Sequence, residues 1–522
     1  TYYVEWVLGV RREGNAAFIV TEWDENTQSL QARNTYQEHF KGATSFLGVY
    51  PQSDLSAGCE DEFPCEWSWT GDRREFIGRG GTLEHPAALH RERLSGKTGV
   101  CGDSCGAVQI RFSLEAGEEG MIYVVLGCED SREAAARLAA TYRDSRVCRE
   151  AFERVIRFWE RVTQQIVVST PYPEMDLLLN GWLLYQTLCC RMWARTAFYQ
   201  AGGAYGFRDQ LQDSLALLHT RPDLTRAQIL LHAAHQYEEG DVQHWWHEET
   251  GRGIRTRFSD DYLWLPYAVA RYIEHTEDDR ILDEQIPFLH SEPLRDEEHE
   301  RYEPTQVSQQ SGTLYEHCLR AIDRALLRLG EHGLPLIGIG DWNDGMSRIG
   351  ASGRGESVWL TWFLCDVLSR FADVCQKYGD LERAERYRES RMRLSAAVDR
   401  HAWDGQWYRR AFTDFGQWIG SIRNEECRID AIAQSWSVLS GAAPAEKMRQ
   451  AMQSFDRELV DRGLSLVRLL APPFDRTSPS PGYIQGYPPG IRENGGQYTH
   501  GVIWSVIAWT LLGRPEKAWE LF

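Results

Sequence analysis

Basic residues are scarce relative to acidic ones in this chain. Its 522 residues include 57 lysines and arginines against 76 aspartates and glutamates, which gives a net charge of −19 at pH 7. Proteins that bind nucleic acid or an anionic membrane use clustered basic side chains to displace counterions from phosphate groups. The charge balance therefore argues against both functions, and a neutral ligand such as a sugar fits it better.

Long apolar runs are missing as well. The longest apolar stretch, residues 175–194, is interrupted by Asp176, Asn180, Gln186 and Arg191. It is too polar to cross a bilayer and predicts a buried helix. The N-terminal residues also lack the charged region and apolar core of a secretory signal. We therefore expect no direct membrane insertion of this chain.

Metal-binding motifs are absent too. Twelve cysteines are present, but no two C-x-x-C pairs have the spacing of a zinc site. Several, such as Cys365, lie in apolar stretches, which favours reduced, buried thiols. A loop disulfide between Cys101 and Cys105 is the alternative. His244 and His247 are three residues apart and do not form an H-E-x-x-H helix motif, so we expect no metal and an aromatic, polar cleft wall there.

Aromatic residues, by contrast, are abundant, with 20 Trp and 22 Tyr. Their rings combine a flat apolar face with a polar edge, which suits both large cores and clefts that stack on sugars.

The hydrophobic pattern divides the chain into three parts. Residues 1–128 show short strand patterns separated by turn signals and predict an antiparallel β-sandwich. Ser131 has the position of a helix N-cap, and residues 129–168 predict a helical linker. Residues 169–522 carry successive amphipathic helices, which predict helix pairs closing into an α/α barrel. The expected strands are 2–8, 16–20, 108–114 and 121–126, and the expected helices are 174–195, 209–219, 223–238, 260–275, 312–331, 356–377, 380–401, 427–440, 444–462 and 500–512, with a hairpin-like break at 403–408.

Both ends of the chain interrupt a pattern. A strand pattern is cut off at Thr1 and a helical pattern at Phe522. We expect both end domains to be incomplete and the chain to be part of a longer protein or of a homodimer. Without further polypeptide packed against them, we expect these apolar side chains to be exposed to water: Val502, Ile503, Val506, Ile507, Leu511 and Leu512.

The first group of chemically useful residues is Gly-Phe-Arg-Asp-Gln-Leu-Gln-Asp at 206–213, at the start of a predicted helix. Arg208 offers a fork of donors, and Asp209, Gln212 and Asp213 lie within one turn of one another. Such a mixture of donors and acceptors suits the hydroxyls of a sugar ring. The alternative is a capping and salt-bridge cluster at the helix N-terminus.

The second group is Gly-Ile-Gly-Asp-Trp-Asn-Asp-Gly-Met at 338–346, where glycines flank Asp341 and Asp344 around Trp342. Glycine lets the backbone turn tightly, and the Trp offers an apolar wall that favours a protonated neighbouring carboxyl. A protonated carboxyl is what departure of a glycoside leaving group needs. We favour catalysis over a structural loop, with Asp341 beside the acid as a substrate-binding residue.

The third group, residues 487–500, is a Pro- and Gly-rich loop that leads into a helix near His500. Arg492 and His500 near a helix N-terminus could bind an anion, since exposed backbone N–H groups there add to the side-chain charge. A structural loop beside a core histidine is the alternative.

Together these segments resemble glycoside hydrolase family 94, a family of inverting phosphorylases. The resemblance covers the whole chain and rests on GFRDQLQD at 206–213, EGDVQHWWH at 239–247, TRFSDDYLWLPYA at 256–268, GDWNDGM at 340–346 and PPGIRENGGQYTH at 488–500. The GDVQHWWH and ENGGQYTH versions look most like the branch with the phosphorylase-like domain of cyclic β-1,2-glucan synthases and the β-1,2-oligoglucan phosphorylases. The resemblance implies a β-sandwich, a helical linker and an (α/α)6 barrel.

The resemblance also implies residue roles. Asp344 would be the single general acid, Trp342 would line the subsite of the transferred glucosyl unit, and Arg208 and Asp213 would bind its hydroxyls. His500 would contact phosphate, with Arg492 assisting. In the family, further phosphate contacts come from a Thr-Gly pair well beyond that histidine, and this chain stops at Phe522 before that stretch could occur. Either the pair belongs to another part of a longer protein, or the site here is incomplete.

The implied reaction is reversible phosphorolysis of a β-glucan or β-glucoside oligosaccharide to α-glucose 1-phosphate. Inorganic phosphate is then a co-substrate, and no cofactor is needed. The implied location is the cytoplasm, either free or as the cytoplasmic part of a membrane-bound synthase. Two rivals stay open: an inverting hydrolase with Asp341, Asp260 or Asp261 as its base, and a glucan-binding domain that controls chain length without efficient turnover.

Overall fold

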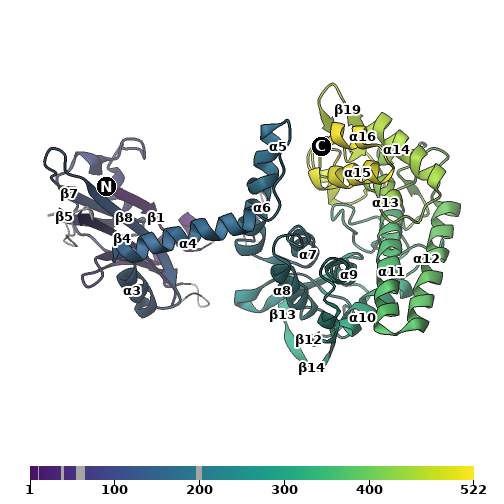
Figure 1. The fold of residues 1–522 in the computed structure, drawn as a ribbon, viewed down its shortest axis with the longest axis horizontal. Coiled ribbons are helices and arrows are strands. Elements are labelled where there is room, and N and C mark those ends of the chain that lie inside the picture. The colour runs from purple at the N-terminus through teal and green to yellow at the C-terminus, as the bar shows by residue number, and fades with distance from the viewer. Residues whose placement is uncertain (10, 37–39, 41, 54–64, 196–202) are drawn as a thin grey trace. The chain divides into compact units, whose positions relative to one another are not determined.

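The computed structural model describes residues 1–9, 11–36, 40, 42–53, 65–195 and 203–522. The chain forms two compact units, Thr1–Gln164 and Gln165–Phe522, the first rich in strands and the second in helices (Figure 1). Within the segment predicted as a linker lie α3 (Arg132–Thr141) and α4 (Ser145–Thr163). Ser131 caps α3 as predicted, because its hydroxyl accepts a hydrogen bond from the Ala134 N–H at 3.2 Å.

The first unit contains the predicted antiparallel sandwich. One sheet has the strand order β6-β2-β3-β4-β8 and the other has β1-β7-β5. The two sheets share an apolar core, in which the Trp23 and Trp69 rings stack with centroids 3.9 Å apart. The strands are β1 (Tyr2–Glu5), β2 (Ile19–Asp24), β3 (Ser29–Asn34), β4 (Thr44–Ser53), β5 (Cys65–Asp72), β6 (Gly99–Val100), β7 (Ser104–Phe112) and β8 (Gly120–Glu129).

One local prediction in this unit is wrong, and one alternative is excluded. The strand expected at 16–20 starts only at Ile19, because Ala16–Phe18 form a 3-10 turn and the Phe18 ring stacks on Tyr36 instead of continuing the strand. Cys101 and Cys105 are separate buried thiols, so the loop disulfide does not form.

The second unit has a helix at every position where one was expected. Successive contacts join α7, α9, α11, α13 and α15 in this order, and α8, α10, α12, α14 and α16 pack against them in turn. This alternation matches paired helices; closure into an (α/α)6 barrel stays a prediction. The helices are α5 (Pro173–Leu177) and α6 (Leu183–Gln186) with π-helical turns around α6, α7 (Phe207–Leu215), α8 (Pro222–Ala233), α9 (Trp264–Thr276), α10 (Leu314–Leu327), α11 (Val358–Tyr378), α12 (Leu381–His401), α13 (Ala431–Leu439), α14 (Ala445–Leu459), α15 (Thr499–Leu511) and α16 (Pro515–Leu521).

Side-chain exposure on α15 only partly follows the expectation. Ile503, Ile507 and Leu511 are exposed, whereas Val502 is buried in the core of the helical unit. Among the described helices, none is long and apolar enough to span a lipid bilayer.

Several strands between the helices were not predicted. β9 (Tyr205–Gly206), β10 (Gln243–His247), β11 (Arg252–Thr256) and β13 (Glu300–Pro304) form one antiparallel sheet, and β12 (Gln285–His290) pairs with β14 (Gln306–Thr313). The Gln-His-Trp-Trp-His sequence of β10 lacks the alternation by which strands are recognised. This sheet matters for the site, because β10 carries residues of the main pocket.

A buried ion pair holds the 338–350 loop, which carries both candidate acids. The Arg410 guanidinium donates to both carboxylate oxygens of Asp341, at 2.6 and 2.7 Å, and neither side chain is exposed. The Ser357 hydroxyl donates to the same carboxylate at 2.6 Å while it caps the N-terminus of α11. Asp430, the N-cap of α13, lies 3.4 Å from the Arg410 Nε atom. The loop is therefore tied to the start of two helices, α11 and α13.

We predict that Arg410→Met destabilises the helical unit by about 3–5 kcal/mol, because it leaves two buried carboxylates without their cation. The double variant Arg410→Met/Asp341→Asn should recover part of this loss, since one unpaired charge is then removed. Urea unfolding followed by tryptophan fluorescence measures both effects. Arg354→Met, at an exposed arginine, is the matched control and should change stability by less than about 0.5 kcal/mol. Equal unfolding midpoints for Arg410→Met and this control would contradict the prediction.

Candidate active site

Arg208 lies at the centre of the candidate site, in the first turn of α7. The turn begins at Gly206, whose N–H donates to the Gln210 side chain at 2.5 Å. The Arg208 side chain is almost fully buried, and its guanidinium lies 3.1 Å from Asp260 and 3.4 Å from Asp261. Buried charges are tolerated in proteins when they are paired in this way.

The same guanidinium also binds Asp344. Its two terminal nitrogens donate to one carboxylate oxygen, Oδ1, at 2.9 and 2.8 Å, and one of them donates to the Trp342 carbonyl at 3.1 Å. The second oxygen, Oδ2, has no hydrogen-bond partner among the described residues. About a third of the Asp344 side chain is exposed, whereas Asp260 and Asp261 are buried. Of the acids bound to Arg208, Asp344 is therefore the one that can meet a substrate.

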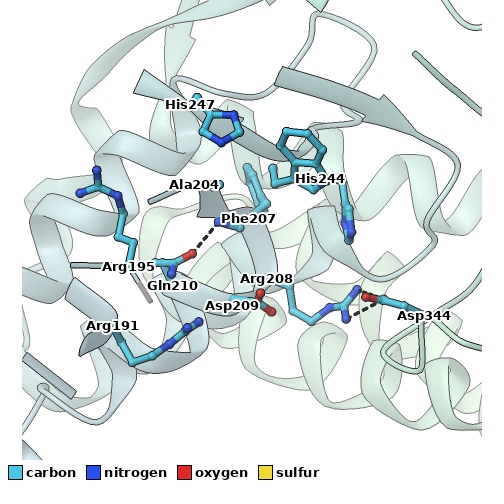
Figure 2. A pocket seen from close by; sticks show the side chains of 12 residues that line it. Arg191, Arg195, Ala204, Phe207, Arg208, Asp209, Gln210, His244, His247 and Asp344 are labelled. Atoms are coloured by element: carbon cyan, nitrogen blue, oxygen red, sulfur yellow. Dashed lines mark hydrogen bonds and ion pairs between the residues drawn. The ribbon is translucent and has the colours of Figure 1, made fainter. Parts of the chain in front are cut away.

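A pocket of about 300 Å³ opens beside Asp344. Figure 2 shows Arg208 extending to Asp344 on one side of this pocket, with Arg191 and Arg195 on the other. Asp209 and Asp344 are the two carboxylates among its lining residues, whereas three arginines supply positive groups. The lining comprises Arg191, Arg195, Ala204, Gly206, Phe207, Arg208, Asp209, Gln210, His244, Trp245, His247 and Asp344.

The two acids of the 338–350 loop differ sharply in their surroundings. Burial alone would raise the pKa of Asp341, but the Arg410 guanidinium and the Ser357 hydroxyl lower it below its usual value. With no exposed area and both oxygens bound, Asp341 cannot reach the pocket. Its predicted role as a substrate contact is therefore corrected to that of a loop anchor. The predicted tight turn is present, because Gly340 has a φ of +140° and a side chain there would collide with Phe258.

Trp342, Gln212 and His500 meet at a second point near the site. The His500 ring lies edge-on to Trp342, with centroids 5.3 Å apart, and its Nε2 lies 3.2 Å from the Gln212 amide. Surrounding protein lowers the pKa of His500 to about 4, although its side chain remains open to solvent. At neutral pH the ring is therefore uncharged, so any contact with an anion relies on a hydrogen bond.

Two other predicted residues form ion pairs of their own. Asp213 accepts a hydrogen bond from Arg191 at 2.6 Å, and burial raises its pKa to about 6 despite this partner. Arg492 lies 3.3 Å from Glu493, and its guanidinium stacks over the Tyr487 ring at 4.6 Å. Arg492 is not among the residues that line the main pocket.

His244 is a pocket residue whose chemistry the sequence did not reveal. It lies on β10, and its Nδ1 atom is 2.8 Å from the buried Asp261 carboxylate. Burial alone would lower the pKa of His244, but the Asp261 charge raises it to about 9. The ring is therefore an imidazolium at neutral pH. Among the described residues, no three histidines, cysteines or acids are arranged to hold a metal ion.

Comparison with known proteins places this geometry in a family. The profile of the glycosyl hydrolase 94 superfamily catalytic domain matches residues 158–522, and that of the glycosyl hydrolase 94 supersandwich domain matches residues 1–145. A bacterial glucoamylase in complex with acarbose has a similar fold, with a TM-score of 0.56 at 11% identity; the match covers 97% of this chain and 68% of the glucoamylase chain.

Two relatives are informative. The cyclic beta-(1,2)-glucan synthase NdvB of Rhizobium meliloti (strain 1021) is 43% identical over 521 residues, which are 100% of this chain and 18% of the relative. The solabiose phosphorylase of Paenibacillus borealis is 31% identical over 453 residues, 86% of this chain and 55% of the relative. The chain thus spans about half of the second relative and a smaller share of the first. Since the two family profiles together match most of its length, the chain belongs to the glycosyl hydrolase 94 superfamily.

Proposed function

We propose that the chain catalyses inverting phosphorolysis of β-glucosidic bonds and releases α-glucose 1-phosphate. The observation that carries the proposal is the state of Asp344: Arg208 binds one carboxylate oxygen, and the other is unbound beside the pocket. Relatives named as solabiose phosphorylase and N,N'-diacetylchitobiose phosphorylase support the reaction class. The relative named as a cyclic β-(1,2)-glucan synthase supports a β-1,2-glucan or oligoglucan as substrate.

In the proposed reaction a phosphate oxygen attacks the anomeric carbon from the face opposite the leaving sugar. As the new C–O bond forms and the glycosidic C–O bond breaks, Asp344 transfers its proton from Oδ2 to the departing oxygen. The negative charge that remains on Asp344 is stabilised by the two N–H groups of Arg208, which are already in place. Because the glycosyl phosphate formed can be attacked by an incoming sugar hydroxyl, the reaction can run in both directions.

The burial of Asp341, Asp260 and Asp261 argues against these three acids as the base of an inverting hydrolase. An inverting hydrolase needs a second carboxylate about 6.5–9.5 Å from the acid to activate water. Asp341, Asp260 and Asp261 were the candidates, and their exposures are 0%, 0% and 2%. Each is held in an ion pair, so none can bind a water in the pocket. A phosphate dianion is itself a nucleophile and needs no such base.

We place the glucosyl unit near Arg208, Asp209, Gln212 and Asp213, with Trp342 as an apolar wall. His500 and Arg492 are the proposed phosphate contacts. Support for His500 comes from its open side chain beside the Trp342 ring.

Asp344→Asn should abolish release of glucose 1-phosphate, because an amide cannot deliver the proton, and should leave glucan binding nearly intact. The assay measures this release from a panel of β-1,2-, β-1,3- and β-1,4-glucans. Phosphate-dependent product formation on this panel also tests the reaction and its linkage. Asp209→Asn, at the other carboxylate of the pocket, is the control and should mainly raise the KM for glucan. Retention of more than about a tenth of the rate in Asp344→Asn, or glucose release without phosphate, contradicts the proposal. Glucan binding without turnover by the unmodified chain would favour a binding domain instead.

His500→Ala should raise the KM for phosphate several-fold and leave the KM for glucan within about twofold. The pKa of His500 is about 4, below the ordinary histidine value of 6.5, so the ring is neutral throughout the range from pH 5.5 to 7.5. The ratio of phosphate KM between variant and unmodified chain should therefore stay constant from pH 5.5 to 7.5. Initial rates over a phosphate series at each pH provide the test. A rise in the KM for glucan alone would show that His500 contacts the sugar instead.

A further inference from the structure

His244 is fixed in position from several sides. β10 pairs with β9 on one edge and with β11 on the other, and His244 lies between the paired residues Gln243 and Trp245, where the register shifts. The imidazole stacks on Phe258, with ring centroids 4.3 Å apart, and its Nδ1 donates to Asp261 at 2.8 Å. Asp261 in turn lies 3.4 Å from Arg208 through its other oxygen. The imidazole is therefore held by a ring contact and by an ion pair.

One ring nitrogen of His244 is left for a ligand. Nδ1 is used by Asp261, whereas Nε2 has no hydrogen-bond partner among the described residues. The ring lines the pocket and is 18% exposed. With the ring protonated at neutral pH, Nε2 carries a hydrogen and is a charged donor directed to whatever fills the pocket.

The position of His244 relative to Asp344 indicates which part of the substrate it meets. Both residues line the same side of the pocket (Figure 2). In the proposed reaction Asp344 lies next to the leaving sugar, and phosphate attacks from the opposite face of the anomeric carbon. A donor beside Asp344 therefore reaches the leaving sugar more readily than it reaches phosphate.

We propose that His244 is a specificity-determining residue that donates a charged hydrogen bond from Nε2 to a hydroxyl oxygen of the leaving sugar. The inference rests on the proposed function and adds the residue that binds the sugar on the acceptor side. By holding this sugar, His244 brings its bridging oxygen to Oδ2 of Asp344. In the synthetic direction the same contact selects the incoming acceptor.

His244→Gln tests the contact, since Gln is neutral and cannot keep a ring stacked on Phe258. We expect the KM for glucan in phosphorolysis, and the KM for the acceptor sugar in synthesis, to rise at least tenfold. The KM for phosphate should stay within about twofold, the reverse of the pattern expected for His500→Ala. A circular dichroism spectrum and melting temperature equal to those of the unmodified chain exclude misfolding. A selective rise in the phosphate KM would overturn the proposal and make His244 a phosphate ligand.

A pH series gives a second, independent measurement. His244 is faced by Asp261 from the turn before α9, by Arg208 from α7 and by Asp344 from the 338–350 loop. Loss of the ring proton near pH 9 should raise the KM for glucan in the unmodified chain. His244→Gln should not show this rise, and Asp261→Asn should show it at lower pH. A rise that persists in His244→Gln would mean that another group titrates.

Calorimetric titration of glucan without phosphate separates this inference from the proposed function. If the unmodified chain releases no glucose 1-phosphate but His244→Gln binds glucan at least tenfold more weakly, phosphorolysis is wrong and the sugar contact stands. If the unmodified chain is active, and it and His244→Gln bind glucan equally well, the contact is wrong and phosphorolysis stands.

Discussion

One guanidinium, that of Arg208, is the interaction on which the candidate site depends. Asp260, Asp261 and Asp344 come from two different loops, and their charges would repel one another if no cation lay between them. Arg208 contacts all three, and the His244 imidazolium supplies a second cation beside Asp261. Burial makes such pairing obligatory, because an unpaired charge away from water is costly. The position of Asp344 is therefore set by the charge balance of the cluster as well as by its own loop.

The 338–350 loop is held from two sides. Arg410 binds Asp341 on the buried side, and Arg208 binds the Trp342 carbonyl and Asp344 on the pocket side. The two acids are three residues apart but have different roles: Asp341 anchors the loop, whereas Asp344 is partly exposed and can meet a substrate. Because both arginines come from outside the loop, its conformation depends on the packed helical unit as well as on the local turn at Gly340.

The sequence predicted the sandwich, the positions of the helices and the segments that carry the site, because hydrophobic periodicity and long motifs are local signals. It could not show which of Asp341 and Asp344 faces the pocket. That distinction depends on Arg410, which is distant in the chain and carries no motif of its own. The charge of His244 could not be predicted for a similar reason. It depends on Asp261, 17 residues further on, and the strand that carries His244 lacks alternation. The barrel closure, the domain boundaries and the phosphate contacts remain predictions.

The contrast between the acidic surface and the cationic lining of the pocket has a kinetic consequence. A chain with a net charge of −19 repels the proposed co-substrate, a phosphate dianion, at long range, whereas Arg191 and Arg195 attract it once it reaches the pocket mouth. Added salt screens the first effect over distances beyond about 8–10 Å and weakens the second less, because the second acts at short range in a partly buried cavity. In the proposed reaction, moderate ionic strength should thus speed the capture of phosphate, while the same long-range repulsion favours escape of an anionic sugar phosphate into solution.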